Sequence, residues 1–96
     1  MSSSVIERDP YEQKAFGQTL IGFESDMRTC CKTLKGHIQD AQDTIQADNA
    51  AKALNDIVSL IEEIESCLPD VGEFGTRQMK LAQKIIEAQE YHFTRH

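Results

Sequence analysis

Apolar side chains recur at helical spacing along most of this chain, and this pattern constrains the fold more than any other feature. Such spacing places the side chains along one side of a helix, where they form a seam that packs against a neighbouring helix. The pattern therefore predicts an all-α fold built from long helices. Steps of three or four residues give a first series of Phe16, Leu20, Phe23, Met27, Cys31, Leu34, Ile38, Ala41 and Ile45, and a second of Leu54, Ile57, Ile61, Ile64 and Leu68.

Helix start and stop signals divide this pattern into three segments. Asp9 is a suitable N-cap and Pro10 a suitable first helical residue, so the first helix is expected to run from there to about residue 47. Asp48-Asn49 marks the first break. The segment Pro69–Gly75 marks the second, because a proline and two glycines within seven residues disfavour a continuous helix.

The segment lengths favour one architecture. The first helix is about as long as the two later segments together, which predicts a long helical hairpin with its second arm broken or kinked near Pro69–Gly75. A compact three-helix bundle is the alternative. Residues 1–8 are expected to form a flexible N-terminal tail, and residues 9–94 a single helical domain.

Charge and hydropathy exclude several classes of function. A net charge of −6 over 96 residues argues against binding to nucleic acid or to anionic membranes. No stretch approaches 18 apolar residues, so membrane insertion is not expected. The first residues lack the basic and apolar regions of a cleavable signal peptide. We therefore expect a protein made in the cytoplasm, whose export with a partner would need a leaderless route.

No motif for chemistry stands out, so the chain is not expected to be an enzyme. His92 and His96 are four residues apart, but they lie at the end of the chain and are expected to be solvated. Cys31 and Cys67 fall at seam positions and are expected to be small buried side chains. We predict no catalytic residues, no bound cofactor and no metal site.

Apolar residues beyond a single seam suggest a partner. A two-helix hairpin buries one stripe on each arm, and additional exposed apolar positions on so small a protein usually mark an interaction surface. A tighter bundle that buries them within the chain is the competing explanation. The partner-interface candidates are Ile21, Val58, Leu60, Ile85, Ile86 and Phe93.

An acidic chain of this length, without a leader and with two long helical arms, resembles the WxG-type superfamily of type VII secretion and its effector-associated LxG-type helical partners. The family's Trp-x-Gly turn is replaced here by residues 46–51, Gln-Ala-Asp-Asn-Ala-Ala, and its C-terminal Tyr-x-x-x-Asp/Glu by Tyr91 followed by Arg95. Both departures fit a protein that accompanies an effector carrying the secretion signal itself. The resemblance implies bacterial helical hairpins that pair into four-helix assemblies.

These observations predict a non-catalytic protein–protein interaction module. Its expected role is that of a type VII secretion-associated partner or chaperone, which packs against the helical N-terminal region of a larger effector. A second helical-hairpin protein, or a second copy of the chain in a homodimer, is the alternative partner. A small acidic regulatory or inhibitory protein, of the phage-encoded or toxin-neutralising type, is the alternative function.

Overall fold

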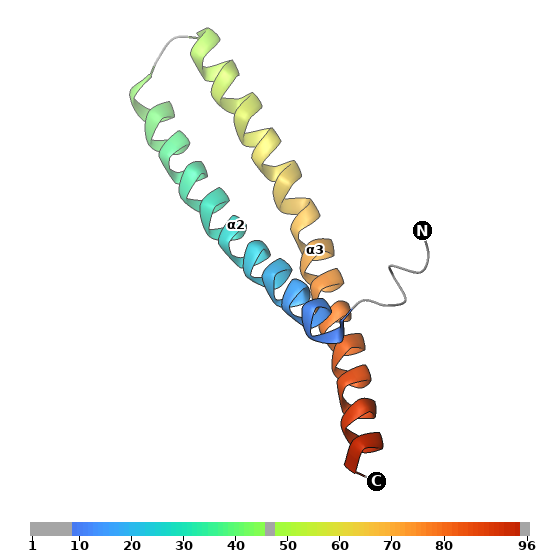
Figure 1. Ribbon diagram of the computed structural model, residues 1–96. Coiled ribbons are helices and arrows are strands. Elements are labelled where there is room, and N and C mark those ends of the chain that lie inside the picture. Colours follow the sequence, from blue (N-terminus) through green and yellow to red (C-terminus); the bar gives the residue numbers. More distant parts are fainter. Residues whose placement is uncertain (1–8, 46–47, 95–96) are drawn as a thin grey trace. The chain divides into compact units, whose positions relative to one another are not determined.

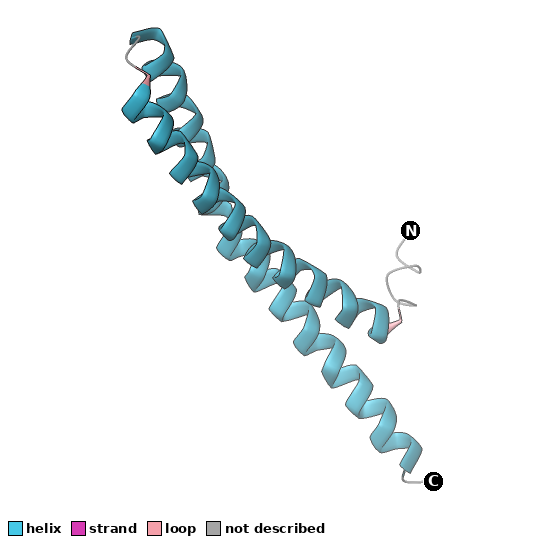
Figure 2. Ribbon diagram, turned by 90° about the vertical axis from the view of Figure 1, so that its left-hand side faces the viewer, coloured by secondary structure: helices cyan, strands magenta, loops and turns pink. Residues whose placement is uncertain are grey.

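The computed structural model describes residues 9–45 and 48–94, except for the side chains of residues 92–94. Two α-helices account for nearly all of these residues, α2 over Pro10–Thr44 and α3 over Asp48–Thr94 (Figure 1). Among the described residues there is no strand (Figure 2). The predicted all-α helical hairpin is confirmed.

The start of α2 follows directly from the sequence. The backbone amide of Tyr11 donates a hydrogen bond of 2.9 Å to the carboxylate of Asp9, as predicted for an N-cap. At the other end, the helix stops at Thr44, and the amide of Ile45 bonds to the carbonyl of Ala41 at 2.8 Å. The first predicted break at Asp48-Asn49 is therefore slightly late, since α3 already begins at Asp48.

The predicted break at Pro69–Gly75 is wrong, because α3 continues through it as one helix. An interior proline removes one backbone hydrogen bond and destabilises a helix, but packing overrides this preference here. Gly72 and Gly75 are buried and extend the seam of α3 across the expected break. The segment expected to start at Thr76 is a continuation of α3, which also rules out the compact three-helix bundle. The seam of α3 consists of Leu54, Val58, Ile61, Glu65, Leu68, Gly72, Gly75, Met79, Ala82 and Ile86.

The chain divides into two compact units, each made of one segment of α2 and one of α3. Unit 1 comprises Met1–Gly22 and Val71–His96, and unit 2 comprises Phe23–Asp70. In unit 2 the core forms around Cys31, Ile38 and Ile61, with Leu54 and Val58 partly buried against it. This core is small, because each helix contributes only one narrow seam.

In unit 1 the two backbones approach closely at a pair of glycines. A Cβ atom built on Gly17 would lie 2.5 Å from the carbonyl oxygen of Gly75, and one built on Gly75 would lie 2.8 Å from the carbonyl oxygen of Gly17. No side chain fits at either position without moving the backbone. Among the described residues of this unit, Ala82 and Ile86 are the buried apolar side chains.

Neither described helix contains an apolar stretch of the length and hydropathy that a bilayer crossing requires.

Candidate interaction surface

One flank of unit 2 is polar and links the two helices through side-chain contacts. Lys35 on α2 forms an ion pair of 2.8 Å with Glu65 on α3, and Gln42 donates a hydrogen bond of 2.8 Å to Asn55. The higher the residue number on α2, the lower that of its partner on α3, as expected for antiparallel segments. These contacts identify the flank on which both helices present polar groups.

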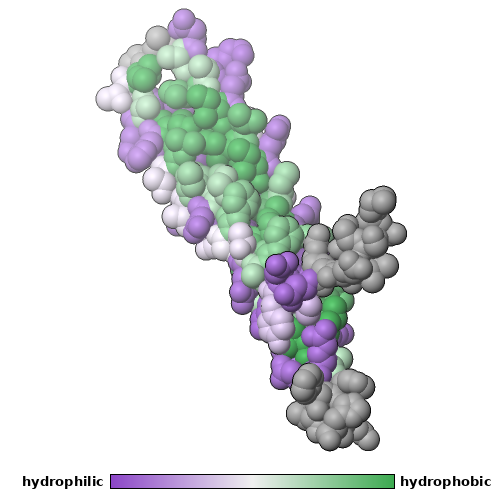
Figure 3. Space-filling model, in the orientation of Figure 1, coloured by the Kyte–Doolittle hydropathy of each residue, from purple (hydrophilic) through white to green (hydrophobic). Residues whose placement is uncertain are grey.

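The opposite flank of unit 2 is apolar and exposed. Phe23, Leu34, Ile57, Leu60 and Ile64 each directly precede a buried or partly buried residue, so they lie about 100° round the helix from the seam. In an antiparallel pair, the residues that precede the seam on both helices share one face. We call these five residues the apolar face; their exposed fractions range from 38% to 57%. Figure 3 shows hydrophobic surface extending over both helices in this part of the hairpin.

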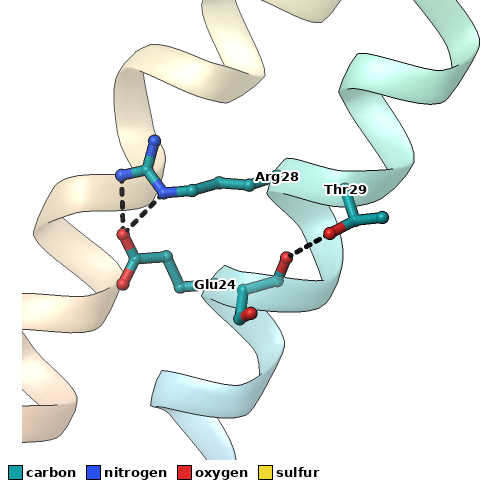
Figure 4. Close-up of polar contacts among 4 residues, drawn as sticks. Glu24, Arg28 and Thr29 are labelled. Atoms are coloured by element: carbon teal, nitrogen blue, oxygen red, sulfur yellow. Dashed lines mark hydrogen bonds and ion pairs between the residues drawn. The ribbon is translucent and has the colours of Figure 1, made fainter.

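The seam of α2 includes a charged residue, Glu24, whose charge is balanced within the same helix. Arg28 donates from Nε and from a terminal guanidinium nitrogen to one carboxylate oxygen of Glu24, at 3.0 and 2.6 Å (Figure 4). The hydroxyl of Thr29 donates to the backbone carbonyl of Ser25 at 3.2 Å. These contacts join residues one turn apart on α2 and leave the apolar face uncovered.

The ion pair on the polar flank shifts the pKa of Lys35. The hydrogen bond from Lys35 to Glu65 raises the pKa of the Lys35 ammonium group above its ordinary value, against a smaller opposing effect of desolvation. The charges of Glu65 and Glu62 add to this increase. The higher pKa favours the charged ammonium form, which is the form that pairs with Glu65.

The structure places the six predicted interface residues in different environments. Leu60 and Ile85 are exposed, as an interface requires, with exposed fractions of 57% and 44%. Ile21 is partly buried in unit 1, where its side chain lies near Gly75. The side chain of Phe93 lies outside the described residues.

Two of the six candidates belong to the intramolecular seam, which corrects their expected placement outside it. Val58 packs against the core of unit 2, and Ile86 is buried in unit 1 with 4% exposure. The reason is that the side of α3 that faces α2 is displaced by one residue from the expected series. The seam of α3 passes through Val58 and Ile86, whereas Ile57 and Ile85 beside them are exposed.

Most residues of the apolar face are not predicted as exposed from the sequence. The spacing predicts that Phe23, Leu34, Ile57 and Ile64 lie in the seams, but the structure leaves them exposed. The missed signal is a second series of three- and four-residue steps on α3, displaced by one residue from its seam. We call this series the outer stripe; it comprises Ile57, Leu60, Ile64, Cys67, Val71 and Phe74, and resumes at Leu81, Ile85 and Ala88.

The cysteines and histidines do not assemble a chemical site in the described part of the chain. Cys31 is buried as expected. Cys67 is exposed and belongs to the outer stripe, so its predicted burial in the seam is wrong. No group of three or more His, Cys, Asp or Glu side chains within residues 9–45 and 48–91 is arranged to hold a metal ion. The side chains of His92 and His96 lie outside the described residues.

No protein family model, curated protein sequence or solved structure matches this chain. The apolar face is therefore the feature on which a functional interpretation rests.

Proposed function

We propose that this protein is a non-catalytic interaction module whose apolar face packs against a helical segment of another protein. The observation that carries this proposal is the exposure of five large apolar side chains on one flank of unit 2, opposite a polar flank closed by Lys35–Glu65 and Gln42–Asn55. Contiguous apolar surface on a small protein usually marks a binding site. A shallow face between two helices suits an amphipathic helix with apolar residues at three- and four-residue spacing.

The resemblance to the WxG-type superfamily suggests which protein supplies that helix. We propose the helical N-terminal region of a larger effector, with this chain acting as its type VII secretion-associated partner or chaperone. The chain would then be made in the cytoplasm and leave, if at all, together with that effector. A protein of this kind needs neither a Trp-x-Gly turn nor a C-terminal signal of its own, because the effector carries the export signal.

Co-expression with the helical N-terminal region of a long protein encoded beside this chain tests the proposal. We expect a stable heteromer by light scattering, which Leu34→Glu weakens at least tenfold because the new carboxylate would be buried at the contact. Thr33→Glu adds the same charge one residue away, at an exposed position outside the apolar face, and is expected to bind like the wild type. Circular dichroism checks that both variants remain helical.

Salt dependence distinguishes the alternative function, a small acidic inhibitor of a basic target. Binding through the apolar face changes little between low and high ionic strength, whereas binding through the acidic surface weakens strongly as salt screens the charges. Failure of Leu34→Glu to weaken a complex that salt dissociates would favour the inhibitor and contradict our proposal.

A further inference from the structure

Unit 1 carries an open groove on the exposed side of its α3 segment. The groove has a volume of about 460 Å³ and is lined by Glu73, Thr76, Arg77, Lys80, Leu81 and Lys84. We call it the basic groove, because three of its six side chains are cationic. A groove of this size that is open along its length suits an extended or helical segment better than an enclosed small molecule.

Two lysines of the basic groove have no anionic partner. Within the described residues, Lys80 and Lys84 form no ion pair. They are four residues apart, so they are neighbours on the helix surface, where like charges repel and destabilise the helix. The end of α3 does not explain their position, since Thr94 is ten residues beyond Lys84 and the helix dipole acts only within the last turn.

The acidic residues near these lysines along the helix are engaged elsewhere. Glu73 pairs with Arg77 at 3.2 Å, in an exposed ion pair that is easily exchanged for another. Glu87 accepts a hydrogen bond of 3.1 Å from the side-chain amide of Gln83. The basic groove therefore presents unneutralised positive charge on a chain whose net charge is −6.

The basic groove also has an apolar component, which belongs to the outer stripe. Leu81 lies in the groove, and Phe74 and Ile85 continue its row along α3; their exposed fractions are 46%, 46% and 44%. The spacings of seven and four residues keep these side chains on one side of the helix, over a length of about 16 Å. A ligand that uses the whole surface must offer apolar groups in a row and negative charges beside them.

We propose that the basic groove binds an acidic amphipathic helix of another protein. Its apolar side chains would contact the row around Leu81, and its carboxylates would pair with Lys80 and Lys84. Charge complementarity favours this occupant, because an acidic helix supplies both kinds of group at three- and four-residue spacing. Nucleic acid and anionic membranes are disfavoured, since the acidic chain as a whole repels extended polyanionic surfaces.

This second docking site goes beyond the proposed function and can fail independently of it. The proposed function depends on the apolar face, which lies in unit 2, whereas every residue of the basic groove belongs to unit 1. Charge variants of the groove therefore test the acidic helix without altering the apolar face.

Fluorescence anisotropy of labelled peptides with the purified full chain tests the charge requirement. The probe is a synthetic helix of about 20 residues, with leucines at three- and four-residue spacing and glutamates along one edge. Its control carries glutamine in place of each glutamate. At low ionic strength we expect the glutamate peptide to bind at least tenfold more tightly than the glutamine peptide.

Substitutions in the chain then assign this preference to the basic groove. We expect Lys84→Glu to weaken binding of the glutamate peptide roughly fivefold and to leave the glutamine peptide unaffected. Lys32→Glu changes the net charge identically at an exposed site in unit 2 and is expected to bind both peptides like the wild type. Leu81→Gln is expected to weaken both peptides, because they share the apolar contact.

Four results would overturn the proposal. Two of them are absence of binding at millimolar glutamate peptide, and equal weakening by Lys84→Glu and Lys32→Glu. The third is a peptide that shifts backbone amide resonances of residues 57–64 rather than 73–85, which would place it on the apolar face. The fourth is sedimentation with phosphatidylserine vesicles that Lys84→Glu abolishes, which would assign the groove to an anionic membrane.

Discussion

At the scale of single residues, the close approach of Gly17 and Gly75 makes the sharpest prediction. Gly17→Ala places a Cβ atom 2.5 Å from a backbone oxygen and 2.8 Å from Cγ of Met79, so we expect destabilisation by roughly 1–3 kcal/mol despite the better helix propensity of alanine. Gly22→Ala is the matched control. Its Cβ would meet nothing within 4 Å, so alanine is expected to stabilise α2 by about 0.5–1 kcal/mol. Urea denaturation of both variants measures the difference, and equal stabilisation would contradict the close approach.

Interactions confined to neighbouring residues are the part of the structure that the sequence predicts best. The Asp9 cap depends only on a carboxylate and an amide two residues away, so the sequence alone suffices. The close approach of Gly17 involves Gly75, which lies 58 positions later in the chain. From the sequence alone, Gly17 is expected only to weaken its own helix. A glycine that weakens an isolated helix can thus be required by the packing of two helices.

At the scale of the helix, Pro69 is an unfavourable residue in the interior of α3. It has no amide hydrogen to donate to the carbonyl of Glu65, yet the helix continues around it. Pro69→Ala restores this donor, and we expect the free energy of unfolding to rise by about 1–3 kcal/mol. Ser59→Ala, an exposed substitution on the same helix, is expected to change it by only a few tenths. A loss of thermal stability in Pro69→Ala would show that the proline, rather than the packing, sets the local backbone.

The continuity of α3 and the phase of its seam could not be obtained from local signals. Proline and glycine preferences describe an isolated helix, whereas Gly75 packs closely against Gly17 of α2, where a small residue is an advantage. The seam and the outer stripe of α3 both advance by three and four residues, one position apart. A single sequence shows both series but not which one meets α2. The spacing predicts Ile57 in the seam and Val58 outside it, whereas the structure places Val58 against the core and leaves Ile57 exposed.

At the scale of the whole molecule, the structure combines a narrow core with a wide apolar surface. The buried apolar side chains are few among the described residues, and none of the large ones is fully enclosed. A domain of this size buries a smaller fraction of its surface than a larger one and is correspondingly marginal. Association with another chain would add to the stability of the folded state, because a partner that binds only the folded form stabilises it by mass action. The apolar face is the surface through which such stabilisation would act.

The distinction between core and interaction surface can be tested with the same substitution one helical turn apart. Ile61 is 4% exposed and Ile57 is 43% exposed. Ile61→Asp buries an unpaired carboxylate at a cost of several kcal/mol, a large part of the stability of a small domain, so we expect loss of cooperative unfolding and of helical circular dichroism. Ile57→Asp keeps its charge in water and is expected to retain both, while losing the helical partner. If the two variants unfolded alike, Ile57 would be a core residue and the apolar face would not be available for binding.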